Sequence, residues 1–122
     1  MIDGIFTIGV PVSDQDRALE FYVDRLGFEK RRDMPSPQLG GRWIEVAPIG
    51  ANVTLALVPA REKSPAGVET GIRLRTGDAA AVHADLQARG VEVGELLRWP
   101  GVPPMFALRD QDGNGLEIVQ AA

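Results

Sequence analysis

The chain has no cysteine and a single histidine, His83. The missing thiols exclude disulfide bonds, a cysteine nucleophile and thiolate metal ligands. His83 falls within a predicted helix, which makes a serine–histidine nucleophile difficult to build. No apolar run approaches the roughly 20 residues that cross a bilayer, and neither the phosphate-binding nor the dinucleotide-binding glycine pattern occurs. We therefore expect no membrane partner and no nucleotide site of these kinds.

Positive charge is also scarce, since 13 basic residues face 17 acidic ones and the net charge is −4. This argues against a nucleic-acid partner, which needs a basic patch. The densest basic run, Lys30–Arg32, is followed at once by Asp33 and indicates a solvated strand end. The acidic surplus suits a cationic small molecule, but it also serves solubility alone. Residues 1–4 carry no export pattern, so we expect a cytoplasmic protein.

The 122 residues predict a single domain, 1–122, in which one pattern occurs twice. Alternation predicts a strand over residues 5–10, and Ser13 with Asp16 predicts a capped helix that Gly27 ends. The Pro- and Gly-rich residues between Phe28 and Arg42 predict a loop. The predicted strands that follow are residues 42–46 and 52–58.

The second half repeats this order after a connector around residues 64–67. Asp78 follows Asp14 by 64 residues, and Gly90, which ends the second helix, follows Gly27 by 63. The sequence thus predicts an α+β fold of two βαβββ modules, 1–63 and 68–122, that form a curved mixed sheet around a cleft. The second module is predicted to contain strands at 70–75, 91–93, 105–109 and 116–120, a helix at 78–89, a loop at 98–104 and a turn at 110–115.

Several motifs carry a resemblance to a known family. They are Val10–Asp14, Ala18–Tyr22, Leu26–Phe28, Leu86–Val91 and Asp110–Glu117. Together they resemble the vicinal-oxygen-chelate superfamily, which includes glyoxalase I, fosfomycin-resistance enzymes, extradiol dioxygenases and bleomycin-resistance proteins. The resemblance covers nearly the whole chain. It implies the fold but not the chemistry, because members of this superfamily differ in what they do.

The resemblance also implies where a divalent metal would be held in metal-dependent relatives. Those positions correspond here to Thr7, Gly71, Glu117 and Leu55, or to Thr54 in place of Leu55 if the register is one residue off. Gly and Leu offer no donor, and Thr is a poor ligand for transition metals. We therefore expect no metal and no other cofactor.

Strand alternation predicts which side chains line the cleft. Phe6, Ile8 and Val10 should pack under the first helix. Glu117 should face inward. There it could act as a base, bind a ligand amine, or form a structural ion pair with Arg73. Tryptophan rings suit stacking, although core packing is the alternative for Trp43. Trp99 begins a stiff lip, and of Met105 and Phe106 one should face in. The full predicted ligand-binding set is Thr7, Trp43, Leu55, Gly71, Arg73, Trp99, Met105, Phe106 and Glu117.

Three functions follow from these observations. The first is a metal-free protein that sequesters a small hydrophobic or cationic aromatic molecule, as the resemblance to bleomycin-resistance proteins implies. The second is a lyase or isomerase that uses Glu117 as acid and base while Arg73 steadies an oxyanion. The third is a regulatory or structural dimer with a vestigial cleft. The resemblance also implies a homodimer.

Overall fold

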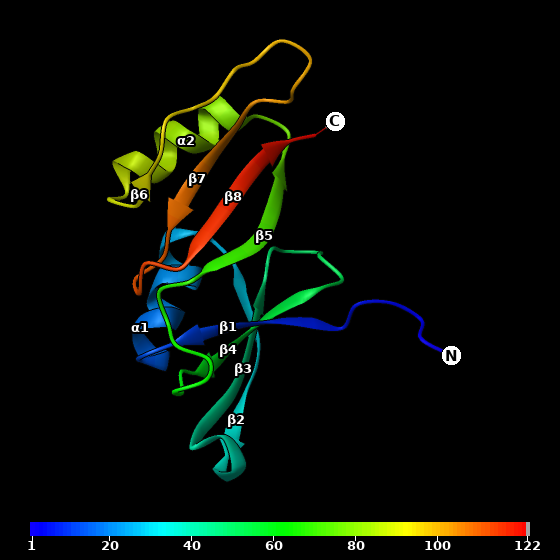
Figure 1. Cartoon of the computed structure of the whole chain (residues 1–122), viewed down its shortest axis with the longest axis vertical. Helices are drawn as coiled ribbons and strands as arrows, with labels where there is room; N and C mark the ends of the chain where they lie inside the picture. Colours follow the sequence, from blue (N-terminus) through cyan, green and yellow to red (C-terminus); the bar gives the residue numbers. More distant parts are fainter. Residues whose placement is uncertain (122) are drawn as a thin grey trace. The chain divides into compact units, whose positions relative to one another are not determined.

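The computed structural model describes residues 1–121. The chain divides into two compact units, unit 1 (Met1–Gly67) and unit 2 (Val68–Ala122). Each unit contains, in chain order, a strand, a helix and three further strands (Figure 1). The prediction of an α+β fold built from two βαβββ modules is confirmed.

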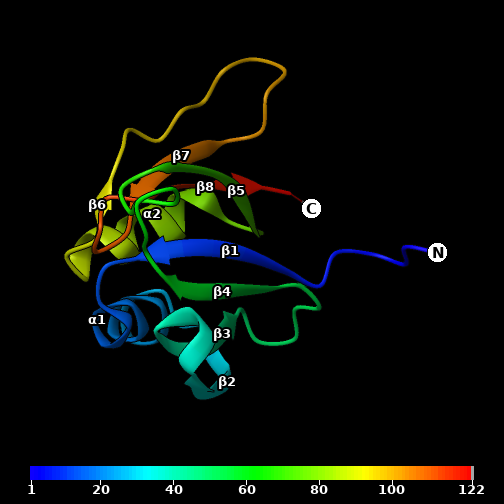
Figure 2. The same cartoon turned by 60° about the horizontal axis from the view of Figure 1, so that its bottom comes forward.

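Unit 1 is a four-stranded mixed sheet with the order β1-β4-β3-β2. Strands β1 and β4 are parallel, and the other neighbours are antiparallel. Residues 1–6 lead away from β1 as an extended segment (Figure 2). The elements are β1 (Thr7–Val12), α1 (Gln15–Leu19) continued by a π-helical turn (Glu20–Arg25), β2 (Glu29–Ser36), a 3₁₀ turn (Pro37–Leu39), β3 (Gly41–Ala47) and β4 (Thr54–Pro59).

One face of this sheet forms the core of unit 1 under the helix. Gln15 joins helix to sheet, because its Nε2 donates to the carbonyls of Arg42 (2.6 Å) and Leu57 (2.8 Å). Its Oε1 accepts from the Arg42 amide at 3.0 Å. Apolar burial supplies the main stabilisation of such a face. The buried residues of this core include Val10, Val12, Ala18, Phe21, Tyr22, Phe28, Ile44, Val46, Leu55 and Leu57.

The beginning of unit 1 differs from the prediction in two respects. The first strand starts at Thr7, so Phe6 lies outside it and is 68% exposed instead of packed under the helix. The helix is capped by Asp14, whose Oδ1 accepts from the Arg17 amide at 3.1 Å, and the cap predicted at Ser13 is wrong by one residue. Asp14 has the extended backbone that an N-cap requires.

Strand β2 was missed, since its residues were predicted to form a loop. It pairs antiparallel with β3 from Glu29 to Ser36. Pro35 is tolerated within it because β2 lies at the edge of the sheet, where a missing N–H breaks no ladder on the outer side. Proline content is therefore a poor guide to loops at the edge of a sheet.

Unit 2 repeats the topology, with the order β5-β8-β7-β6. Asp78 caps its helix by accepting from the Ala81 amide at 3.0 Å. The glycines predicted to end the two helices, Gly27 and Gly90, have φ of 79° and 80°. No described helix is long and apolar enough to cross a membrane. The elements are β5 (Glu69–Thr76), α2 (Ala79–Ala88), β6 (Glu92–Val93), β7 (Met105–Arg109) and β8 (Gly115–Gln120).

The core of unit 2 lies between its sheet and α2. Phe106, Leu108, Leu116 and Ile118 are buried on that side of the strands. His83 lies in α2, the predicted helix, where it is partly exposed, and its ring meets the Phe106 ring edge-on with centroids 4.8 Å apart. His83 Nε2 also lies 2.8 Å from the Gly94 carbonyl. The only histidine of the chain thus has a structural environment.

Candidate functional site

Each sheet has a second face that carries polar side chains, and we call these the polar faces of unit 1 and unit 2. On unit 1, Thr7 of β1 pairs in register with Thr54 of β4, so both side chains lie on this face. Their Oγ1 atoms lie 2.8 Å apart, and the Thr7 hydroxyl donates to the Thr54 carbonyl at 3.1 Å. Leu55 points the other way and is 4% exposed in the core. Its placement on the ligand-facing side is corrected to Thr54, the alternative one residue away.

The same face holds a buried carboxylate, Glu45 of β3, which is 3% exposed. Its Oε1 accepts from Thr54 Oγ1 at 2.9 Å. Its Oε2 accepts from Trp43 Nε1 at 2.7 Å. Because Trp43 is two residues away on the same strand, both side chains lie on one face, and the hydrogen bond fixes the edge of the indole. Trp43 is half-buried and does not belong to the core under the helix.

The polar face of unit 2 carries an ion pair in place of a buried acid. Arg73 of β5 pairs in register with Glu117 of β8, and Arg73 Nη2 lies 3.3 Å from Glu117 Oε1. The two side chains are 66% and 37% exposed. Met105 lies on the same face, because it is two residues from Ala107, which pairs with Glu117. The Met105 side chain is half-buried. Phe106 points to the core and is 1% exposed, so its place in the predicted ligand-facing set is wrong.

Gly71 lies in an irregularity of β5. The register with β8 shifts between Glu69 and Arg73, and Gly71 has a φ of 74°. A positive φ favours glycine because a Cβ would crowd the backbone. Thr70 stabilises this bulge, since its Oγ1 donates to the Gly115 carbonyl at 2.7 Å and accepts from the Ile72 amide at 3.1 Å. The backbone alone therefore accounts for glycine at this position.

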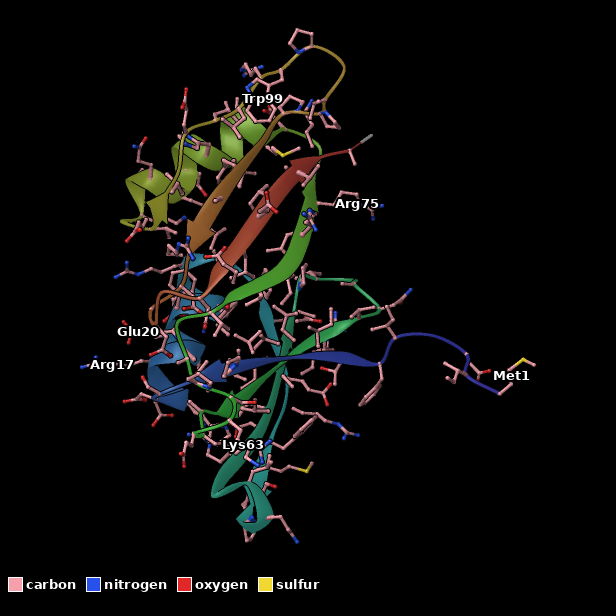
Figure 3. The ribbon with its side chains drawn as sticks, viewed as in Figure 1. Met1, Arg17, Glu20, Lys63, Arg75 and Trp99 are labelled. Carbon is pink, nitrogen blue, oxygen red and sulfur yellow. The ribbon has the colours of Figure 1, made fainter. Side chains whose placement is uncertain are left out.

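Trp99 lies in the loop between β6 and β7 and is 58% exposed (Figure 3). The loop is closed at its base by a bridge between Leu97 and Met105. A turn at its tip joins the Val102 amide to the Trp99 carbonyl at 3.1 Å. Arg75 projects from β5 in the same unit (Figure 3). Trp99 thus presents an exposed aromatic surface, unlike the hydrogen-bonded indole of Trp43.

The residues at the four positions implied for a metal do not fit a transition-metal ion. Thr54 Oγ1 contacts both Thr7 Oγ1 and Glu45 Oε1, and the Thr7 hydroxyl donates to the Thr54 carbonyl. Gly71 has no side-chain donor, and Glu117 pairs with Arg73. Zinc and its neighbours prefer imidazole, thiolate and carboxylate donors converging on one point. Residues 1–121 contain no such convergence of three or more His, Asp or Glu side chains.

The strongest charge cluster of unit 1 joins β2 to β3. Arg42 forms a two-pronged contact with Asp33, Nε to Oδ1 at 3.0 Å and Nη2 to Oδ2 at 2.8 Å, and also contacts Asp16 at 2.7 Å. The hydrogen bonds from Arg42, aided by Lys30, lower the pKa of Asp33 from 3.8 to about 2. These acids in turn raise the pKa of Arg42 above its ordinary value. The cluster stabilises the sheet edge and lies apart from the hydroxyl and indole groups described above.

Sequence reasoning left Glu45 out of the predicted ligand-binding set and placed Thr54 second to Leu55. A signal for Glu45 was present, because Trp43, Glu45 and Ala47 alternate with the buried Ile44 and Val46. Alternation puts Glu45 on the face opposite the core. The burial of that carboxylate could not be read from the strand alone, because it depends on neighbouring strands.

Comparisons with known proteins agree with this architecture. The model of the glyoxalase/bleomycin resistance protein/dioxygenase superfamily matches residues 4–118. TnmS3, an antibiotic binding protein from Streptomyces sp. CB03234, has 38% sequence identity to this chain. Its crystal structure matches with a TM-score of 0.88, and the match covers 99% of this chain and 98% of TnmS3. A superfamily member from Sphaerobacter thermophilus is 34% identical, also with a TM-score of 0.88, over 98% of each chain.

A curated relative covers nearly as much of the chain. The uncharacterized protein YetH of Bacillus subtilis is 34% identical over 119 residues, which span 93% of this chain and 95% of the relative. The match to the family model extends over nearly all of both units. This chain therefore belongs to the glyoxalase/bleomycin resistance protein/dioxygenase superfamily.

Proposed function

We propose that this protein binds a small hydrophobic or cationic aromatic molecule without a metal, as a sequestering protein, and that the polar face of unit 1 supplies contacts to it. One observation carries the proposal: the Thr7 and Thr54 hydroxyls contact each other where metal-dependent relatives would place two ligands. On the same face, Trp43 offers a half-buried indole held by Glu45. An indole suits stacking on flat hydrophobic or cationic rings.

Three further facts support binding. TnmS3, which is 38% identical, is an antibiotic binding protein. The net charge of −4 favours the approach of a cation. By itself, the polar face of unit 2 carries Arg73, Met105 and Glu117, a mixture of charge and apolar surface that suits an amphipathic ligand. The proposal includes a cytoplasmic location and no nucleic-acid partner.

A binding screen tests the proposal. Tag-free protein is heated with a panel of polycyclic aromatic antibiotics, flat organic cations and neutral aromatic compounds, and every compound that raises Tm is titrated by calorimetry. We expect at least one binder, and Trp43→Leu should weaken it at least ten-fold. Ile49→Ser is the matched control, because Ile49 is 80% exposed on the loop after β3. A panel without a binder would contradict the proposal.

A second candidate is supported by the ion pair on unit 2. Arg73 beside Glu117 places a cation next to a carboxylate that is 37% exposed, which are the groups an acid–base lyase or isomerase needs. Any turnover found with a panel compound should then fall at least a hundred-fold in Glu117→Gln. Turnover that survives this change excludes Glu117 as the base.

The proposal also includes a homodimer. The apolar side chains of Ile5 and Phe6 are each 68% exposed in the single chain, which is unusual for large apolar groups at adjacent positions. One chain has a mass of 13.1 kDa, and light scattering during size-exclusion chromatography should give twice this mass. A concentration-independent monomer would refute this part.

A further inference from the structure

Glu45 is a nearly fully buried carboxylate, and both groups that contact it are neutral. Thr54 Oγ1 and Trp43 Nε1 each reach one oxygen, at 2.9 and 2.7 Å. A carboxylate has about four acceptor positions, so two donors leave it incompletely satisfied. Burying an ionised carboxylate without a cation carries a large desolvation cost.

The described residues offer no cation in contact with it. None of their ion pairs includes Glu45. Arg32 lies opposite Glu45 in the register between β2 and β3, but its side chain is exposed and does not form an ion pair with Glu45. The arginine at the cross-strand position therefore lies on the same face of the sheet but makes no direct contact with the carboxylate.

Trp43 connects this buried charge to the surface. Its Nε1–H points at Glu45 Oε2, so the plane of the indole is set by the carboxylate, while part of the ring remains accessible. A flat ring stacked on the indole lies within one ring width of the Nε1 edge, and therefore near the carboxylate that this edge contacts. In these partly dehydrated surroundings a charge acts more strongly than it does in water.

From these contacts we propose that Glu45 and Trp43 form a recognition site for a planar aromatic cation, with Trp43 as the stacking surface and Glu45 as the counter-ion. This inference rests on the proposed function and narrows it from hydrophobic or cationic ligands to cationic ones. Thr54 and Thr7 act as positioning residues, because they hold the carboxylate in place through the hydroxyl pair.

A pair of ring systems of equal shape tests the site. The first probe is 9-aminoacridine, a planar cation at neutral pH, and the second is acridone, its uncharged analogue. Calorimetry measures both in the full-length protein. We expect the cation to bind at least ten-fold more tightly than acridone, because only the cation compensates the buried charge.

The variants assign this preference to residues. Glu45→Gln keeps the size of the side chain and removes its charge, and it should weaken 9-aminoacridine at least ten-fold while acridone changes less than two-fold. Glu62→Gln removes the same charge from an exposed residue of unit 1 and should change neither probe. Trp43→Leu should weaken both probes, since it removes the stacking surface.

The fluorescence of Trp43 reports whether a probe stacks on this indole. In Trp99→Phe protein Trp43 is the only indole, and a probe stacked on it should quench its emission at saturating concentration. Should Glu45→Gln fail to fold, equal affinity of the wild-type protein for the two probes overturns the proposal by itself.

Unchanged cation binding in a folded Glu45→Gln variant also overturns the cation site. If neither acridine binds but another panel compound does, the cation site is refuted and the proposed function stands. If no panel compound binds, both are refuted.

Discussion

The two units share one topology but carry different chemistry on their polar faces. In unit 1, Thr7 and Thr54 occupy paired positions of β1 and β4 and contact each other beside the buried Glu45. In unit 2, the corresponding strands β5 and β8 present Arg73 and Glu117 as an exposed ion pair. The comparison teaches that repeated strand order fixes the backbone scaffold, whereas a few side chains decide what each face can bind.

The largest expected effect tests what the units have in common, their buried faces. Leu55→Ala in unit 1 and Phe106→Ala in unit 2 should each lower the free energy of unfolding by about 3 kcal/mol or more, because each leaves a cavity in a core. Met105→Ala, one residue from Phe106 on the other face, should cost about 1 kcal/mol or less. Urea denaturation measures all three. Equal losses for Met105 and Phe106 would contradict the assignment of faces in β7.

The next effect separates the two carboxylates. Thr54→Val removes one donor from the buried Glu45 with little change of shape and should cost about 2 kcal/mol, since the buried charge loses a hydrogen bond. Arg73→Met removes the partner of the exposed Glu117 and should change stability by about 0.5 kcal/mol or less. A cost for Arg73→Met as large as that for Thr54→Val would erase the distinction between the faces.

Two strand glycines sharpen the comparison at the backbone. Gly71→Ala should cost about 1 to 2 kcal/mol, because φ at this bulge is 74°. Gly9 lies in β1 without a positive φ, and the space that a Cβ would occupy there is open, so Gly9→Ala should be neutral or slightly stabilising. Thermal unfolding of the two variants measures the difference. A neutral Gly71→Ala would show that the bulge relaxes freely.

The smallest effect concerns pH and belongs to unit 1. The pKa of Asp33 is about 2 in the folded protein against 3.8 ordinarily, so its ion pair stabilises the fold above about pH 4, and that stability is lost as pH falls from 4 towards 2. After allowance for solvent screening the contribution is about 1 kcal/mol. Urea unfolding at pH 5 and pH 2.5 should show a smaller change in Asp33→Asn than in wild type.

The matched control for the pH effect is Asp85→Asn in unit 2. Asp85 pairs with Arg89 on the helix surface, with side chains 57% and 45% exposed. Removing this exposed pair should leave the acid sensitivity of the wild-type protein in place. If the acid sensitivity disappeared in Asp85→Asn and persisted in Asp33→Asn, its assignment to Asp33 in unit 1 would be contradicted.

Most of the fold was accessible from the sequence because both units obey simple periodicities. The β7 bounds and the ends of both helices at Gly27 and Gly90 follow from alternation and capping alone. Strand β2 was missed because its pairing depends on β3 and not on its own composition. Local patterns report local structure, and edge strands are defined by their neighbours.

The candidate site was less accessible because side-chain direction changes with a shift of one residue. Assigning Leu55 instead of Thr54 to the polar face moves every side chain of β4 to the opposite face of the sheet. Arg73 and Glu117 were paired correctly as one alternative, since the parallel register of β5 and β8 brings them together. The contacts of Glu45 with Thr54 and Trp43 combine two strands, and only the structure reveals them.

The measurement that tests the account most directly is calorimetric titration of a panel binder into chelator-treated protein, repeated after addition of Zn, Ni, Mn or Fe. We predict the same affinity and stoichiometry in every case, together with a metal content of less than about 0.1 per chain by plasma mass spectrometry and no rise in Tm on metal addition. Near-stoichiometric metal, or binding that requires its addition, would contradict the account and would point instead to a metal-dependent enzyme.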